Sequence, residues 1–296
     1  MNTQNYIQNI FKLNNEVEFN SLALQLFNYQ YENNITYKKY VDFIYPKKLK
    51  LKHYSEIPFL PIELFKTQKI LSTQENHQAL FISSGTTTNN RSKHYIIDLN
   101  IYRKSIIASF NFFFSNPENF IFLCLVPNYE ENPHSSLSFM CNELIKESKS
   151  NQSGFFLKKE NELKEVIIDC EKHKRKFILF GLSLEILKFA ENNNISIRSG
   201  VVIETGGTKR GQKRIIKTEL HTKIKALFNI EKVYSEYGMA ELLTQSYLLN
   251  NSCFHSPPWK KILIRDKTNP LRILNTNQKG CINIIDLANI YSCGFI

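Results

Sequence analysis

The residues best suited to chemistry in this sequence are a cluster of hydroxyl side chains around one glycine, placed directly after an apolar run. The run 79–82 is predicted to be a strand, and it leads into Ser83, Ser84, Gly85, Thr86, Thr87 and Thr88. Glycine removes the Cβ that would block a ligand from approaching the backbone, and hydroxyls add donors beside backbone N–H groups. This composition predicts a loop that wraps a polyphosphate, with a Ser/Thr-rich surface loop as the alternative.

Two segments farther along the chain also place glycine after a predicted strand. The strand 200–204 is followed by Thr205 and then by Gly206 and Gly207. The spacing from Gly206 to Gly211 is that of a P-loop. However, Gln212 stands where that motif requires lysine, which argues against a P-loop. The third segment follows the predicted strand 232–234 and consists of Tyr237, Gly238, Met239, Ala240 and Glu241.

The order of these three segments resembles the adenylate-forming superfamily of acyl- and aryl-CoA ligases and luciferases. There the first loop holds the β- and γ-phosphates, the Gly-Gly turn lies along adenine, the tyrosine stacks on adenine, and the glutamate helps to hold Mg²⁺. The resemblance therefore implies ATP and Mg²⁺ as cofactors. It assigns residues 83–88 to phosphate, Gly206 and Gly207 to the adenine-side turn, Tyr237, Gly238 and Met239 to the adenine face, and Glu241 to catalysis and the metal. At residue 240 the superfamily usually has threonine, so Ala240 is a departure.

Two N-terminal segments, 18–30 and 57–66, are similar to the acyl-protein synthetase (LuxE) branch, which is itself similar to the phenylacetate-CoA ligases. This branch activates a fatty acid as its acyl-adenylate and passes the acyl group to a protein or carrier thiol. His134 precedes a predicted helix, where the wider superfamily has a His or aromatic residue that gates the acyl pocket. The resemblance makes His134 a second catalytic candidate, while a structural histidine at a helix start is the alternative.

Two other functions stay open beside a fatty-acid–protein ligase. One is an acyl- or aryl-CoA ligase of the phenylacetate type, acting on another carboxylic acid. The other is a nucleotide- or acyl-binding protein without activity, which Ala240 would favour. The sequence stops at Ile296, where the resembled family continues into a hinge and a small lid with a catalytic lysine, so the resemblance predicts that this C-terminal lid is missing.

The elements needed to hold these loops alternate along the chain. Short apolar strands and helices follow one another from residue 79 to 239, which predicts right-handed βαβ units and a largely parallel sheet. Beyond it, runs at 242–249, 261–265 and 281–286 predict a smaller antiparallel portion. We expect an α/β fold in which one large adenylate-forming domain covers 1–296, with mostly parallel sheets flanked by helices. It would include a helical segment at 1–75, with an amphipathic helix at 16–31, and a β-rich subdomain at 242–296.

Composition narrows the environment and the partners. The hydrophobic share of 42% is typical of a globular protein, and no apolar run approaches the length that spans a bilayer. The N-terminus lacks the pattern of a signal peptide, and the 6 cysteines include no C-x-x-C pair, so we expect a cytoplasmic protein with reduced thiols. The net charge of +11 is spread along the chain, and the densest basic cluster, at 209–217, lacks interleaved aromatic residues, so we expect no nucleic-acid partner. The phenylalanine-rich runs 106–114 and 120–126 would suit an acyl pocket or an ordinary core.

Overall fold

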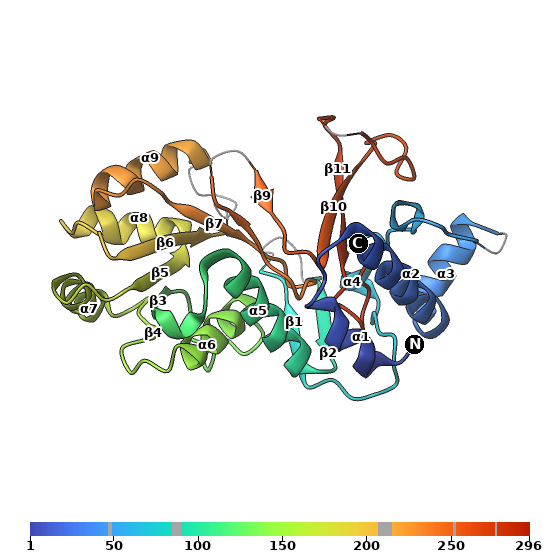
Figure 1. Ribbon diagram of the computed structural model, residues 1–296, viewed down its shortest axis with the longest axis horizontal. Coiled ribbons are helices and arrows are strands. Elements are labelled where there is room, and N and C mark those ends of the chain that lie inside the picture. The colour runs from blue at the N-terminus through green and yellow to red at the C-terminus, as the bar shows by residue number, and fades with distance from the viewer. Residues whose placement is uncertain (47–48, 85–89, 207–214, 251–252, 276) are drawn as a thin grey trace. The chain divides into compact units, whose positions relative to one another are not determined.

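The structure is a computed structural model that describes residues 1–296 except 47–48, 85–89, 207–214, 251–252 and 276 (Figure 1). The chain forms two compact units, each assembled from separate stretches of sequence. The first unit contains residues 1–105, 239–244 and 256–296, and the second contains residues 106–238 and 245–255.

Helices in the first unit begin at asparagine caps. The main ones are α1 (Thr3–Ile10), α2 (Glu16–Asn33) and α3 (Ile35–Ile44). In each, the asparagine before the first residue accepts a hydrogen bond from a backbone N–H inside the first turn, which satisfies a donor that the helix cannot pair itself. The amphipathic helix predicted at 16–31 is confirmed, since α2 buries Phe19, Leu22, Ala23, Leu26, Phe27 and Gln30. The shorter elements are a 3₁₀ turn at Tyr54–Glu56 and α4 (Leu64–Thr67).

Two antiparallel hairpins complete the first unit. Strand β1 (Ala79–Ile82) pairs with β2 (Lys93–Ile96), so the hydroxyl-rich loop joins their ends. Strand β10 (Lys260–Arg265) pairs with β11 (Cys281–Asp286) in a register that places Lys260 opposite Asp286. The β10–β11 pairing confirms the small antiparallel portion of the predicted fold. The β1–β2 pairing differs from the prediction, because these two strands form a separate antiparallel sheet and not part of the parallel one.

The second unit is built on one seven-stranded sheet with the order β4-β3-β5-β6-β7-β8-β9. From β4 to β7 all neighbours are parallel, and β8 and β9 are added antiparallel. This arrangement confirms the predicted α/β fold with a mostly parallel sheet. The strands are β3 (Ile121–Leu125), β4 (Gly154–Phe155), β5 (Phe177–Leu182), β6 (Gly200–Thr205), β7 (Tyr234–Tyr237), β8 (Ser246–Leu248) and β9 (Phe254–His255).

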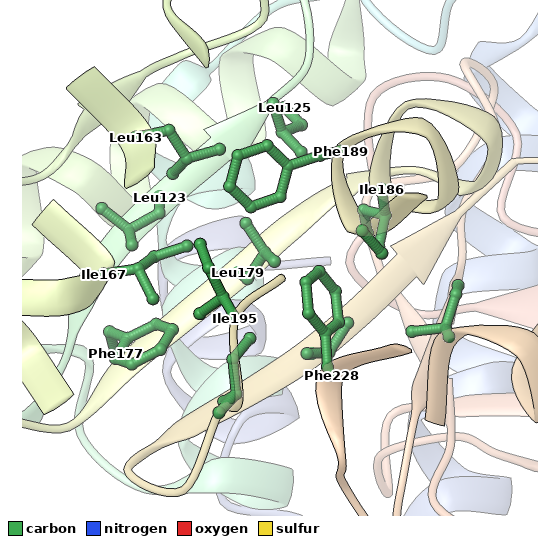
Figure 2. Close-up of a cluster of buried hydrophobic side chains, with 14 of the residues drawn as sticks. Leu123, Leu125, Leu163, Ile167, Phe177, Leu179, Ile186, Phe189, Ile195 and Phe228 are labelled. Atoms are coloured by element: carbon green, nitrogen blue, oxygen red, sulfur yellow. The ribbon is translucent and has the colours of Figure 1, made fainter. Parts of the chain in front are cut away.

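Helices cover both faces of this sheet (Figure 1). On one face, side chains of α7 (Glu160–Lys172), α8 (Ser183–Asn192) and α9 (Lys217–Phe228) pack on alternate residues of the strands (Figure 2). On the other face lie α6 (Ser136–Ser148) and the end of α5 (Leu99–Phe114), beside a 3₁₀ turn at Pro117–Asn119. Strand residues alternate between faces, so β3 gives Leu123 to the first core and Phe122 to the second.

Phenylalanines from the two aromatic runs pack on one another in the second face. The ring of Phe110 lies 5.2 Å from that of Phe122, 5.9 Å from Phe120 and 5.1 Å from Phe114. Phe110 and Phe122 are each 1% exposed. Edge-to-face and tilted contacts of this kind are those of an ordinary aromatic core.

Two predicted boundaries differ from the structure. The strand expected at 242–249 is reduced to β8. Residues 239–244 belong to the first unit, and the backbone N–H groups of Leu243 and Thr244 donate to Asp286 rather than to a neighbouring strand. The strand expected at 232–234 begins only at Tyr234, where pairing with Ile203 of β6 starts. The grouping of residues 1–296 into one domain with subdivisions at 1–75 and 242–296 stays a prediction.

Candidate active site

In the first unit, two hydrogen bonds join Ser83 and Ser92, just beyond the paired ends of β1 and β2; we call this pair of residues the neck of the hydroxyl-rich loop. The backbone N–H of Ser83 donates to the carbonyl of Ser92 at 3.0 Å, and the N–H of Ser92 donates to Ser83 Oγ at 3.0 Å. Ser84 follows the neck and is exposed. Four of the predicted phosphate ligands, Gly85, Thr86, Thr87 and Thr88, lie outside the described residues.

Glu241 lies in the first unit, on an irregular segment that we call the acidic segment, residues 239–244. Its side chain is only 5% exposed. Among the residues that the structure describes, none forms a hydrogen bond with its carboxylate. Glu241 is thus a buried acidic residue on this segment, and its roles in catalysis and metal binding stay predictions.

The acidic segment is anchored by Asp286 at the end of β11. One carboxylate oxygen of Asp286 accepts from the N–H groups of Leu243 and Thr244 at 2.8 and 3.0 Å. The other accepts from Thr244 Oγ1 at 2.6 Å. The buried ammonium of Lys260 donates to the carbonyl of Thr244 at 2.8 Å. These bonds fix the backbone just after Glu241.

In the second unit, the turn after β6 requires glycine at its first position. Gly206 has a φ of +83°, a backbone conformation that is strained for any residue with a Cβ. Below it, Ser183 Oγ lies 3.0 Å from the carbonyl oxygen of Gly206 and 3.1 Å from that of Thr205. The same hydroxyl bonds to the carboxylate of Glu204. Gly207, the other half of the predicted adenine-side turn, lies outside the described residues.

Glu204 is a fully buried carboxylate at the same strand end. Its neighbours are Lys217 at 2.7 Å, His221 at 3.3 Å, and the hydroxyls of Ser183 and Ser235. Burial alone would raise the pKa of Glu204, but the His221 hydrogen bond together with the charge and hydrogen bond of Lys217 lower it to about 2. The strand end that leads into Gly206 therefore contains a paired, ionised group at neutral pH.

Tyr237 ends β7 in the second unit and is half-buried. Its ring meets that of Phe254 at 5.9 Å and 61°, and Lys217 Nζ lies 5.3 Å from the centre of the Phe254 ring. A Cβ at Gly238 would come within 2.5 Å of a carboxylate oxygen of Glu236, so a side chain after Tyr237 would require this carboxylate to shift. Tyr237 thus has a supported ring and a bare following backbone, which suits the predicted contact with a flat base.

His134 lies in the second unit on the exposed turn before α6. Ser135 rather than His134 caps this helix, since its side chain accepts from the N–H of Ser138 at 3.1 Å. The predicted gating role of His134 stays a prediction.

Within each unit, the structure brings some of the predicted residues together. In the second, parallel pairing of β6 and β7 places the approach to Gly206 beside the approach to Tyr237, and Thr205 Oγ1 donates to Glu236. In the first, β2 reaches the acidic segment, because His94 Nδ1 lies 2.8 Å from the carbonyl oxygen of Ala240. Sequence reasoning missed Asp286, Glu204 and Phe254. The sequence placed Asp286 at the end of a predicted strand and Glu204 at the end of another, but neither position indicated a partner.

The residues present fit a magnesium ion held together with phosphate oxygens. No group of three or more His, Cys, Asp or Glu side chains is placed to hold a metal by itself in the described part of the chain. Mg²⁺ with a nucleotide usually takes one or two protein carboxylates and completes its shell with phosphate and water. Glu241, with no hydrogen bond to its carboxylate from any described residue, fits such a site.

No protein-family profile and no curated protein sequence matches this chain. Solved structures do match by shape. ATP-bound MatB from Rhodopseudomonas palustris superposes with a TM-score of 0.54 at 12% identity, over 75% of this chain and 40% of MatB. An open conformation of 2-hydroxyisobutyryl-CoA ligase, in complex with 2-HIB-AMP and CoA, gives 0.67 at 10% identity, over 94% of this chain and 63% of the ligase.

The same ligase in its postadenylation state, with R3-HIB-AMP, gives a TM-score of 0.67 at 11% identity, again over 94% of this chain. This chain spans about 40% of the length of MatB and 61% to 63% of the length of the 2-hydroxyisobutyryl-CoA ligase. It shares the fold of the 2-hydroxyisobutyryl-CoA ligase over 94% of its length and that of MatB over 75%. In the described residues, no helix is both long and apolar enough to cross a membrane.

Proposed function

We propose that this protein activates a carboxylic acid with ATP, as its acyl-adenylate, and transfers the acyl group to a thiol. The fold supports this proposal, because it is shared with ligases crystallised with ATP, with acyl-AMP compounds and with CoA. The observation that carries it is Glu241, a nearly buried carboxylate that no described residue hydrogen-bonds, on a segment anchored through Asp286.

The chemistry is an in-line attack of a substrate carboxylate oxygen on the α-phosphorus of ATP, which breaks the bond to pyrophosphate. Two anions must meet, so the site has to align them and offset their charge. When bound, Mg²⁺ would draw negative charge from the phosphates. Glu241 would hold the cation, the neck at Ser83 and Ser92 would present the hydroxyl-rich loop, and Tyr237 would stack on adenine.

The acyl acceptor separates two forms of this proposal. The similarity of two N-terminal segments to acyl-protein synthetases favours a protein or carrier thiol and a fatty acid. The solved structures favour CoA as the acceptor, because the ligases in them are CoA ligases. Incubating the protein with ATP, Mg²⁺ and acids from acetate to palmitate, with and without CoA, would separate them. Pyrophosphate release that increases with chain length supports a fatty acid, since each buried CH₂ adds about 0.8 kcal/mol of affinity. A preference for phenylacetate would contradict it.

The decisive experiment measures ATP binding by calorimetry with and without Mg²⁺. We expect Glu241→Gln to weaken binding roughly 10- to 100-fold when Mg²⁺ is present, because a charge-assisted contact is lost. Without Mg²⁺ the variant and the natural sequence should bind alike. Glu75→Gln removes an exposed carboxylate of the same unit and serves as the control. An equal loss in both conditions would contradict the metal role of Glu241, and no binding to the natural sequence would overturn the proposed function.

A further inference from the structure

The two peptide groups on either side of Glu241 are each held by a buried side chain from another part of the first unit. His94 of β2 bonds through Nδ1 to the carbonyl oxygen of Ala240 at 2.8 Å. Asn289, three residues after β11, donates through Nδ2 to the carbonyl oxygen of Glu241 at 2.9 Å. With both flanking carbonyls fixed, the backbone of Glu241 has little freedom to rotate, and the direction of its Cα–Cβ bond is set.

The two holding residues are themselves fixed. His94 and Asn289 are each 1% exposed, and His94 Nε2 lies 3.2 Å from Asn289 Oδ1. Asn289 also donates to the carbonyl of Cys293 at 3.0 Å, and its own carbonyl accepts from Gln30 at 2.8 Å. The edge of the Phe65 ring meets His94 at 5.8 Å and 85°. A support whose own side chains cannot move can hold a ligand group in one geometry.

Hydrogen-bond chemistry shows which ring nitrogen of His94 donates to the carbonyl oxygen of Ala240. A carbonyl oxygen only accepts, so Nδ1 must carry the proton that bonds to Ala240. The amide nitrogen of Asn289 already donates to two carbonyls, so its oxygen is the atom that faces His94. An amide oxygen only accepts, so when the single proton of a neutral imidazole is on Nδ1, the 3.2 Å approach of Nε2 to this oxygen is not a hydrogen bond. An asparagine at position 94 could place an amide N–H near the position of Nδ1, whereas a glutamine would place it near Nε2. Comparing the asparagine and glutamine variants therefore distinguishes a role of the hydrogen bond to Ala240 from a role of side-chain volume alone.

We propose that His94 and Asn289 are positioning residues that aim the carboxylate of Glu241 at a nucleotide-bound divalent cation. His94 is on β2, two residues after Ser92, whose N–H donates to Ser83 Oγ. This inference rests on the proposed function. It adds two residues that lie outside the three sequence motifs and whose effect must pass through Glu241.

The test is a double-mutant cycle on ATP affinity, measured by calorimetry with and without Mg²⁺. We expect His94→Ala to weaken Mg²⁺-dependent ATP binding about tenfold, as loss of a residue behind a metal ligand does, and to leave binding without Mg²⁺ unchanged. His94→Asn should stay within about threefold of the natural sequence and His94→Gln should not, since only the former keeps a donor near Ala240. In a Glu241→Gln background, His94→Ala should have no further effect.

Thermal unfolding of each variant controls for folding. Tyr37→Phe removes a buried hydrogen bond to Pro58 in the same unit without touching the acidic segment, and it should leave Mg²⁺ dependence intact. If His94→Ala does not fold, His94→Gln carries the same expectation with a side chain of similar size. Additive losses in the double variant, or equal loss with and without Mg²⁺, would overturn the inference while Glu241→Gln still supports the proposed function. Absence of ATP binding to the natural sequence would overturn both.

Discussion

At the scale of single residues, Glu204 shows how the second unit keeps a charge inside its core. The carboxylate is 0% exposed, and a buried ion is tolerated only when its partners replace water. Lys217 supplies the opposite charge while its own side chain stays 41% exposed, and two serine hydroxyls bond to the remaining positions. Because Ser183 also meets the carbonyl of Gly206, this cluster supports the turn predicted to lie along adenine.

The low pKa of Glu204 predicts a specific loss of stability in acid. Its pKa of about 2 in the folded protein lies below the ordinary value of 4.5, so folding favours the ionised form. The contribution, up to about 3 kcal/mol, is fully present above pH 4.5 and is lost as the pH falls towards 2. Urea unfolding followed by circular dichroism from pH 7 to 2 should show this loss, and Glu204→Gln should flatten it. Parallel losses in both proteins would contradict the assignment.

The sequence indicated the residues whose motifs are local and missed those whose partners are distant. Gly206, Tyr237 and Glu241 stand in short patterns that can be read from a few neighbours. In contrast, His94 and Ala240 are 146 positions apart, and Asn289 and Glu241 are 48 apart. No periodicity or spacing links such pairs, because only the tertiary fold brings them into contact.

At the scale of elements, close strand and ring contacts explain two glycines in the parallel sheet. A Cβ at Gly181 of β5 would lie 2.6 Å from the Cβ of Leu125 on the neighbouring β3. A Cβ at Gly200, the first residue of β6, would lie 2.3 Å from the ring of Phe177. The sequence predicted these strands from their apolar runs, but it could not show which neighbours press on each glycine. Helix α1 lies within the predicted helical segment 1–75, but the sequence did not give its bounds, because it is short and is defined mainly by its Asn2 cap and by the burial of Tyr6 and Ile10.

Alanine substitution of Gly181 tests whether steric crowding, rather than backbone entropy, explains why glycine is needed there. We expect Gly181→Ala to destabilise the second unit by about 1–3 kcal/mol, because the new methyl group meets a buried side chain and the backbone carbonyl of Leu125 at 3.1 Å. Gly154→Ala in β4 is the matched control, since its Cβ would meet Phe156 at an ordinary 3.5 Å. That control should be neutral or slightly stabilising. Chemical unfolding that shows equal effects at both positions would rule out crowding as the cause.

At the scale of the whole molecule, each unit closes its own core, the first from distant parts of the chain and the second from one continuous stretch. In the first, Gln30 of α2 donates to the carbonyls of Asn289 and Ile290 and accepts from the N–H of Gly294. The ring of Phe295 stacks 6.1 Å from that of Tyr37. In the second, the core behind the sheet comes entirely from residues 121–233. The sequence predicted the α/β class from its alternating elements. It did not predict that each unit combines separate stretches of the chain, because the composition does not change where one unit gives way to the other.

Separate cores predict that the two units can be destabilised one at a time. Phe295→Ala should cost the first unit about 3–5 kcal/mol, because the ring is fully buried against Tyr37 and Phe27. Phe228→Ala should do the same to the second, where Phe228 is equally buried beside Phe189. Hydrogen exchange read by peptide would show lost protection in α2 and β11 for the first variant and in β5 and β6 for the second. If either variant lowers protection equally in both sets of peptides, the chain unfolds as one cooperative body and the two cores do not act independently.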